Sequence, residues 1–356
     1  MKELSPQIYR DVMIFNREME MIFKDAPHYL GHEYTIPHIG DYSTLSDEYD
    51  GRMLINTEDG IKIVSNICRH RQAIIQKWKG NTKCITCPLH KWSWNLSGKM
   101  KCSPHFDENL SKHLRTWEVE NWRWLLFEGK ENIAKKLEKI WYHEEINFQN
   151  YKYHRSEYHE CHYNWKTFME VYGDDYHVIP YHPGLSSMVS LKDLTVIQGD
   201  GWHIQSVKSN PKTSYNTTPI YQKWREKCLK QGNGMLPEYG AIWMAYYPNI
   251  MIEVYPYTLT VSTLHPISPE LTMNKVEFFY HMDAHDGLIE AEEAAYMETV
   301  WEDDILAERI EAWRKALIER QKYENIPHDE LTWPYHDPME IGTKHFHDWY
   351  KNTMWL

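Results

Sequence analysis

The chain has 356 residues, enough for two or three domains, and 51 acidic against 39 basic residues give it a formal net charge of −12. This acidic balance argues against nucleic acid or an anionic membrane as the main partner. The sequence has no run of 18 apolar residues and its charged N-terminus has no secretory apolar stretch, so we expect a cytoplasmic protein without membrane spans.

Hydrophobic periodicity divides the chain into helical and β-type segments. Residues 8–23 have apolar side chains at helical spacing and predict a helix. Short β-type runs separated by turn signals predict an all-β unit from about residue 34 to 129. After a charged connector, residues 242–267 and 274–283 predict strands of one antiparallel sheet, and residues 288–320 predict a long amphipathic helix. The predicted fold class is therefore α+β, a β-domain followed by an α+β domain.

Two Cys and two His in two short segments form the first candidate metal site. Cys68, His70, Cys87 and His90 have the spacing C-x-H-x16-C-x2-H. This spacing suits a [2Fe–2S] cluster in which one iron keeps two thiolates and the other takes two imidazoles. A structural zinc site that includes Cys84 is the alternative, but C-x-H is too short for an ordinary zinc loop. The remaining cysteines are most simply small buried residues: Cys102, Cys161 and Cys228.

A second constellation follows the first and has the spacing D-x2-H-x4-H, with Asp174, His177 and His182. Two His and one carboxylate on a single face form the facial triad of non-haem Fe(II) enzymes, which leaves open positions for O2. Because Pro180 breaks a helix between the histidines, we expect them at a helix end and in the loop after it. Such a pair in isolation is more often a surface pair or satisfied core histidines. The preceding Cys/His constellation favours the iron site.

The segments NICRHRQ, CPLHKWSWNLSGKMKCSPHF and NWKTFMEVYGDDYHVIPYH resemble the terminal (α) subunits of Rieske non-haem iron oxygenases. One departure is Gln72, because the family's first loop often continues C-x-H-R-G. The resemblance implies a helical segment at residues 1–33 that packs on the catalytic domain, and a Rieske domain at 34–130. It also implies a catalytic domain at 131–356 with a curved antiparallel sheet wrapped by helices. The implied cofactors are a Rieske [2Fe–2S] cluster and a mononuclear Fe(II).

The resemblance also implies a third iron ligand late in the chain, a carboxylate in an E-D-x4-E setting at the start of a helix. Asp303 fits this setting, and Asp304 is the competing choice. In isolation, these acids would simply favour the positive N-terminal end of a helix. Glu170 matches a family position near the open side of the iron. It could orient oxygen or substrate there or deliver protons, or it could be an ordinary helix acid.

Asp174 has a separate implied role, as a bridge between His90 of one subunit and His177 of its neighbour. A carboxylate that accepts hydrogen bonds from both imidazoles fixes their tautomers and couples the two metal sites. A head-to-tail homotrimer follows from this bridge, because the two sites of one chain are too far apart in the family. The alternative is a surface acid.

The implied reaction uses O2 and two electrons, passed singly from cluster to Fe(II), to hydroxylate a small substrate or to demethylate it with loss of formaldehyde. The sequence has no G-x-G-x-x-G motif after a strand, so electrons must come from NAD(P)H through a separate reductase or ferredoxin. Family substrates include aromatic rings, methylamines and methoxyarenes. Aromatic residues in 241–259 could line a pocket or a cation–π cage, although a core sheet face is favoured. The competing hypothesis is an electron-transfer or zinc-stabilised binding protein without mononuclear iron.

Overall fold

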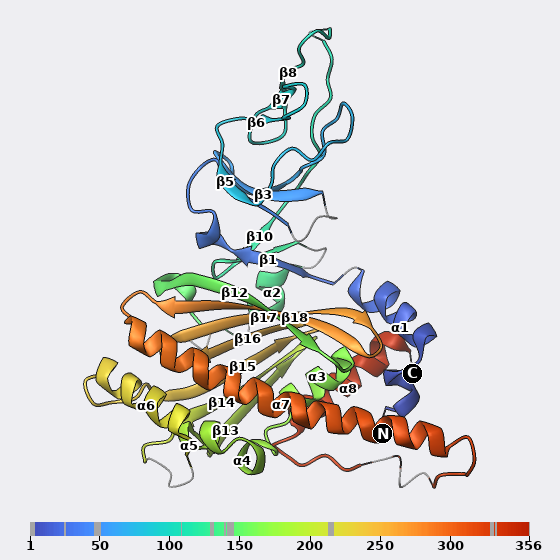
Figure 1. Ribbon diagram of the computed structural model, residues 1–356, viewed down its shortest axis with the longest axis vertical. Coiled ribbons are helices and arrows are strands. Elements are labelled where there is room, and N and C mark those ends of the chain that lie inside the picture. Colours follow the sequence, from blue (N-terminus) through green and yellow to red (C-terminus); the bar gives the residue numbers. More distant parts are fainter. Residues whose placement is uncertain are drawn as a thin grey trace. The chain divides into compact units, whose positions relative to one another are not determined.

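The chain forms two compact units, Pro27–Tyr142 and a second unit that combines Met1–Ala26 with His143–Leu356. The computed structural model describes residues 4–24, 26–45, 51–107, 109–128, 132–138, 140, 146–212, 217–327, 331 and 333–355 (Figure 1). The first boundary lies before the expected residue 33, because strand β1 (His28–His32) pairs with β11 inside the β-unit. The second lies after the expected residue 130: Ile133, at the start of α2, donates its N–H to Glu120 of β10.

The described residues of the β-unit form three small antiparallel sheets. The largest has the order β5 (Lys79–Asn81), β2 (Asp41–Thr44), β3 (Arg52–Thr57), β4 (Gly60–Ser65) and β9 (Thr116–Trp117). The second is β1, β11 (Leu125–Glu128) and β10 (Glu120–Trp122), and the third is β6 (Ile85–Thr86), β7 (Ser93–Trp94) and β8 (Met100–Cys102). Helical turns in this unit are η3 (Glu33–Thr35) and α2 (Ile133–Lys136). Its core joins Met53, Ile55 and Val64 to the two thiols Cys68 and Cys87.

The second unit is built on one seven-stranded antiparallel sheet. Its order is β12 (Tyr151–Cys161), β18 (Leu271–His281), β17 (Thr258–Ser268), β16 (Ile250–Tyr255), β15 (Tyr239–Tyr246), β14 (Trp202–Ser209) and β13 (Val189–Gly199). The strands expected in residues 242–267 and 274–283 are neighbours in this sheet, so that prediction is confirmed.

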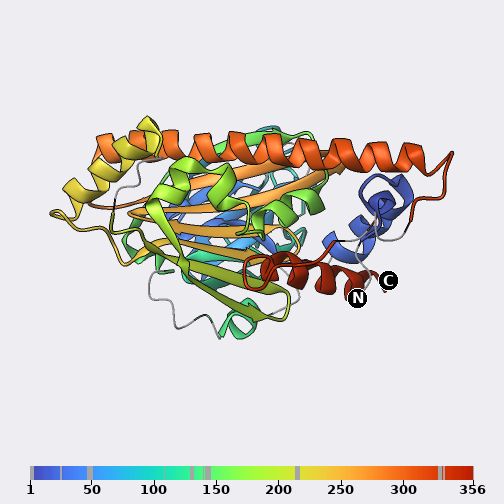
Figure 2. The same cartoon turned by 90° about the horizontal axis from the view of Figure 1, so that it is seen from below.

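Helices cover the face of the sheet on which the candidate iron site lies (Figures 1 and 2). They are α3 (Trp165–Tyr172), α4 (Val178–Tyr181), α5 (Pro183–Met188), α6 (Pro219–Gln231) and α7 (Asp286–Arg320). The apolar side chains of α7 pack on the sheet: Ile289 and Tyr296 contact a cluster of Val276, Phe278 and Tyr280 on β18. The long helix expected at residues 288–320 is α7, and His285 caps it by accepting the N–H of Leu288 at Nδ1 (3.0 Å).

The N-terminal residues pack against α3 and the C-terminal helix α8 (Ile341–Met354). Their helical segment consists of η1 (Pro6–Tyr9), α1 (Val12–Glu18) and η2 (Met19–Phe23), and η5 (Phe148–Asn150) precedes β12. The single helix expected at residues 8–23 is therefore interrupted, because Asp11 accepts the N–H groups of Met13 and Ile14 and starts a new helix. Within the described ranges, no helix is long and apolar enough to cross a membrane.

Candidate metal centres

The segment between α3 and α5 positions the two histidines of the D-x2-H-x4-H motif. Asp174 Oδ1 accepts the N–H of Tyr176 (2.7 Å), which turns the chain after α3. His177 is the N-cap of the one-turn helix α4, and His182 lies at the junction of α4 and α5. The expectation that Pro180 breaks the helix between the histidines was wrong. Pro180 lies in the first turn of α4, where backbone N–H groups have no intrahelical acceptor and their loss costs little.

The long helix α7 supplies the carboxylate. Asp303 lies in the middle of α7, not at its start as expected. The positive end of a helix dipole extends over its first turn only, so the dipole does not account for an acid at this position. Asp303 instead faces the two histidines across the cavity between α7 and α4.

Three potential ligand atoms converge there. His182 Nε2 lies 3.0 Å from His177 Nε2 and 3.0 Å from Asp303 Oδ1, and His177 Nε2 lies 3.3 Å from the same oxygen. Ligand atoms about 2.1 Å from one cation and at right angles to each other are about 3 Å apart. The two imidazoles and the carboxylate therefore fit three adjacent ligands of one octahedral metal ion.

A second carboxylate orients each histidine. Glu302 Oε2 lies 2.7 Å from His182 Nδ1, and Asp174 Oδ2 lies 3.2 Å from His177 Nδ1. Glu302 is a hydrogen-bond partner of His182 Nδ1, whereas Asp174 contacts His177 Nδ1 without hydrogen-bond geometry, and both Nε2 atoms face the centre. Burial by itself would lower the pKa of His177, but the adjacent carboxylates of Asp174 and Asp303 outweigh it and raise this pKa to about 10. Burial would likewise raise the pKa of Asp303, yet the two histidines hold it at about 2. The site thus favours positive charge at its centre.

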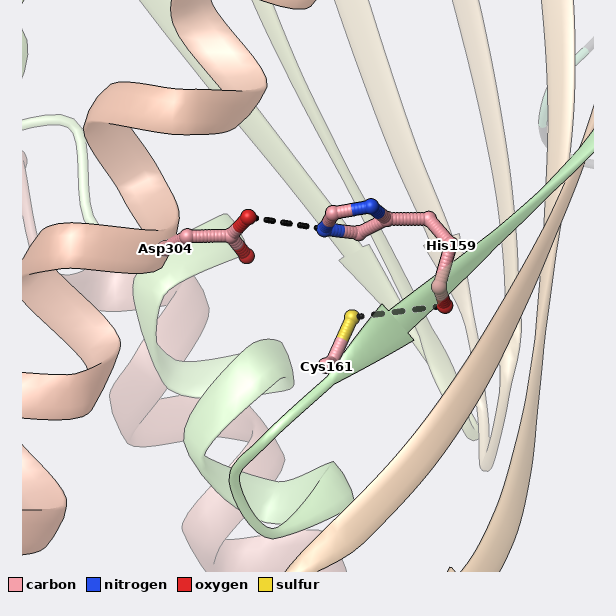
Figure 3. Close-up of side chains that lie close together, drawn as sticks. All are labelled: His159, Cys161 and Asp304. Carbon is pink, nitrogen blue, oxygen red and sulfur yellow. Dashed lines mark hydrogen bonds and ion pairs between the residues drawn. The ribbon is translucent and has the colours of Figure 1, made fainter.

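The competing ligand Asp304 belongs to a different cluster (Figure 3). Its Oδ2 lies 2.7 Å from His159 Nε2, and its Oδ1 accepts the hydroxyl of Tyr163 (2.8 Å). Cys161 is the third member, its thiol 3.9 Å from the backbone oxygen of His159. Burial raises the pKa of this thiol to about 12, so it stays a thiol and a weak ligand. We interpret this group as a hydrogen-bonded wall beside the triad.

Glu170 does not reach the candidate iron site, contrary to its expected catalytic role. Its carboxylate binds the guanidinium of Arg314 (2.5 Å), His347 Nε2 (2.7 Å) and the hydroxyl of Tyr9. Burial tends to raise the pKa of Glu170, but Arg314, His347 and Tyr9 lower it to about 2. Other residues of α3, such as Val171, line the cavity, whereas Glu170 lies on a different face of the helix. The residue connects α3 with α7, α8 and η1.

We expect Glu170→Gln to lower stability while both metal contents remain at the wild-type level. Breaking a buried hydrogen-bonded ion pair costs about 3–5 kcal/mol. Thermal unfolding and iron analysis test this, with Glu308→Gln on the exposed face of α7 as control. A variant with an unchanged melting temperature and lost turnover would instead place Glu170 in the chemistry.

The two loops with the Cys/His constellation have the same backbone form. The N–H of Gln72 bonds to the carbonyl of Cys68 (3.0 Å), and the N–H of Lys91 bonds to that of Cys87 (3.1 Å). Gln72 and Lys91 both adopt positive φ, 58° and 59°. This left-handed conformation accounts for the glycine that the family often has at the position of Gln72. Each loop thereby presents a buried Cys at its start.

The same loops bring their histidines together. The rings of His70 and His90 have centroids 4.6 Å apart, and His70 stacks on Trp92 at 4.8 Å. His70 Nδ1 is buried and has no hydrogen-bond partner among the described residues, which fits a metal ligand. Cys84 instead donates its thiol to the carbonyl of Trp94 (3.1 Å).

Two expectations for the other cysteines have different outcomes. Cys161 and Cys228 are fully buried, as expected, whereas Cys102 is exposed. Cys102 lies at the end of the short strand β8, whose residues are only partly covered, so it is not a core residue.

A cavity adjoins the triad on the α7 side of the sheet. Its lining includes Glu253 and Glu292, acids that the sequence reasoning missed, and Glu302 behind His182 was missed as well. The sequence contains a signal for Glu253, because this acid is the only charged residue of the apolar strand β16. Aromatic residues form much of the remaining wall: Tyr163, Phe168, Tyr172, Tyr221, Trp224, Trp243, Tyr255 and Tyr296. Of the segment 241–259, Trp243 and Tyr255 line the cavity, and Met244, Ala245 and Tyr246 are core residues.

Comparison with known proteins defines the class. Residues 148–355 match the family described as ring hydroxylating alpha subunit (catalytic domain), and residues 40–123 match the Rieske [2Fe-2S] domain. The chain therefore belongs to the Rieske non-haem iron oxygenases, as the sequence predicts.

Individual relatives resemble the chain over nearly its whole length. Putrescine 2-hydroxylase of Ralstonia nicotianae is 44% identical over 355 residues, which cover 99% of this chain and 95% of the relative. Putrescine 2-hydroxylase of Bordetella bronchiseptica is 39% identical over 370 residues, which cover 99% and 84%. A solved structure of the quaternary ammonium Rieske monooxygenase CntA in complex with L-carnitine superposes with a TM-score of 0.74 at 18% identity, covering 99% of this chain and 95% of that chain.

Family membership confirms the predicted enzyme class and cofactors. The chain is an oxygenase component with a Rieske [2Fe–2S] cluster and a mononuclear iron. It uses O2, and electrons from NAD(P)H delivered by a separate reductase, to hydroxylate or demethylate a small organic substrate. The match to the catalytic domain contradicts the alternative of a carrier or zinc-stabilised protein without mononuclear iron.

Proposed function

We propose that this oxygenase hydroxylates a small aliphatic diamine of the putrescine type. His177, His182 and Asp303 would hold the mononuclear iron, and the cluster would be held by Cys68, His70, Cys87 and His90. When bound, the iron supplies O2 activation and the cluster supplies single electrons. The observation that carries the choice of substrate is a pair of buried carboxyl groups in the cavity next to the triad.

The first of these acids, Glu253, has a relative exposure of 6%, and the second, Glu292, of 1%. Neither forms an ion pair with a Lys or Arg within the described part of the chain. Tyr255 and Thr260 donate hydroxyl groups to Glu253 (3.2 and 3.0 Å), and Tyr280 donates to Glu292 (2.6 Å). Burial raises the pKa of Glu253 to about 7 and that of Glu292 to about 8.

Buried carboxylates without a cation are costly, and a bound ammonium group would offset that cost. The aromatic wall suits the same ligand, because the faces of Tyr and Trp attract cations and their edges cover methylene groups. A substrate with its own carboxylate would be repelled by the two acids. Two relatives that match nearly the whole chain, at 44% and 39% identity, are named putrescine 2-hydroxylase, which agrees with an acidic, aromatic cavity.

Electron delivery is the second part of the proposal. Asp174 already contacts His177 Nδ1 and is partly exposed, so its carboxylate can accept a further hydrogen bond. We propose that this bond comes from His90 of a neighbouring subunit in a head-to-tail homotrimer. A solved structure of a quaternary ammonium Rieske monooxygenase, described as giving insights into inter-subunit electron transfer, supports an arrangement of this kind.

A product assay tests the substrate. The holoenzyme is supplied with NAD(P)H and a generic reductase, and O2 uptake is measured together with the mass of the product. We expect putrescine to gain one oxygen atom in step with O2 uptake, and His177→Ala to form no product. L-Carnitine, glycine betaine and benzoate serve as comparison substrates. Product from one of these and none from putrescine would contradict the proposal.

A further inference from the structure

The cavity has two polar ends, one of which is the acidic end at Glu253. Both hydroxyl donors of Glu253 bind its Oε2, so Oε1 accepts no hydrogen bond from the described residues. Tyr255, which binds Glu253, has its ring 6.5 Å from that of Tyr296 on α7. Tyr296 precedes Asp303 by seven residues, which is about 10 Å along a helix. Tyr255 thus connects Glu253 to the part of α7 about two turns before Asp303, and Glu253 Oε1 is an available acceptor atom in the cavity.

The other polar end is Asn274, next to the triad. Asn274 on β18 pairs with His159 on β12, and His159 binds Asp304, the neighbour of Asp303. Its exposure is 3%, it lines the cavity, and its Oδ1 has no hydrogen-bond partner among the described residues. A buried carbonyl oxygen without a donor is uncommon in a folded protein and points to a ligand that donates to it.

The sheet register separates the two ends. Glu253 pairs with Thr260, and Thr260 pairs with Phe278, four residues along β18 from Asn274. Four residues extend about 13 Å along a strand, and two strand spacings add about 10 Å across the sheet. Both side chains project into the same cavity from these positions. An extended four-carbon diamine with a hydrogen bond at each end joins acceptors about 12 Å apart. This length is of the order of the gap left between the two side chains once both extend from these backbone positions into the cavity.

We propose that these two ends bind the two amino groups of the substrate. Glu253 Oε1 accepts a hydrogen bond from the ammonium group remote from the iron. Asn274 Oδ1 accepts a hydrogen bond from the amino group close to the iron. This inference rests on the proposed diamine activity and deepens it. The length of the substrate between the two groups then determines which carbon faces the metal, so Glu253 and Asn274 are specificity-determining residues.

Two substitutions on the holoenzyme test the proposal, with binding measured by calorimetry and kcat/KM by product. Glu253→Gln keeps the shape and the hydrogen bonds but removes the charge. It should weaken putrescine about 10–100-fold and remove the preference for putrescine over the neutral 1,4-butanediol. Asn274→Leu should remove the preference for putrescine over n-butylamine, which has one amino group. Glu293→Gln is the matched control, because Glu293 binds Arg155 (2.7 Å) and is absent from the cavity lining.

A further measurement needs no variant. The affinity of the wild-type holoenzyme for diamines of three to eight carbons should peak at four or five. A flat series, or putrescine binding that neither substitution changes, would overturn the two-ended recognition and leave the diamine activity in place. A wild-type enzyme that binds no diamine would overturn both.

Discussion

Asp303→Ala is expected to remove the mononuclear iron and to leave the [2Fe–2S] cluster in place. The substitution deletes one of three converging ligand atoms, the one that carries the negative charge, and leaves two neutral imidazoles that bind Fe(II) weakly. Iron analysis should fall from about three to about two per chain. Turnover should fall by more than about 100-fold, since the carboxylate is a direct ligand and even outer partners are worth 10–100-fold.

The neighbouring residue provides the control. Asp304→Ala removes the acceptor of His159 and Tyr163 but none of the three converging atoms, so it should keep all its iron. The visible and EPR spectra of the cluster should be unchanged in both variants. If Asp304→Ala loses iron and Asp303→Ala retains it, Asp304 and not Asp303 is the third ligand. If neither variant loses iron, α7 contributes no ligand to the site.

The sequence predicts those parts of the candidate site whose ligands are close together along the chain. His177 and His182 are five residues apart, and the structure brings their Nε2 atoms to 3.0 Å. Asp303 is 121 residues from His182, and only the resemblance to a family pointed to it. The resemblance places it at the start of a helix, whereas the helix predicted from periodicity at residues 288–320 already has position 303 near its middle, where the structure has it.

The sequence does not predict the role of residues whose partners lie far away along the chain. Glu170 is separated from Arg314 by 144 residues and from His347 by 177, so nothing local indicates that it binds them and not a metal or a substrate. Glu253 was visible as a lone charge in an apolar strand, yet its function depends on which helix covers that face. The strands were predictable because alternation and turn signals are local, whereas the pairing order required the fold.

Asp174→Asn is expected to keep both metals and to abolish coupled turnover. Asp174 Oδ1 accepts the N–H of Tyr176 (2.7 Å) and can still do so as an amide oxygen, so the turn after α3 should persist. The group that replaces Oδ2 then presents N–H to His177 Nδ1, where a carboxylate oxygen now lies at 3.2 Å. Two N–H groups then face each other, the histidine loses its negatively charged neighbour, and the acceptor position for a cluster histidine is lost.

A single-turnover experiment isolates the step. The cluster is reduced first, and its reoxidation is followed after mixing with O2 and putrescine. Reduction by the reductase should be unchanged in Asp174→Asn, while reoxidation should slow by about 100-fold. Glu302→Gln is the matched control, because Glu302 orients the other histidine, His182 (2.7 Å), and has no contact with His177. It should weaken iron binding and leave reoxidation in iron-loaded enzyme near the wild-type rate.

The subunit origin of the electron follows from mixed oligomers. One chain carries Cys68→Ser and lacks the cluster, and the other carries His177→Ala and lacks the mononuclear iron. If electrons pass between subunits, mixtures of the two recover activity that neither has alone. Adding Asp174→Asn to the cluster-deficient chain, whose iron is intact, should abolish the recovery, whereas adding it to the chain without mononuclear iron should not. Equal effects in both chains would show that Asp174 acts on the fold and does not bridge the metal sites.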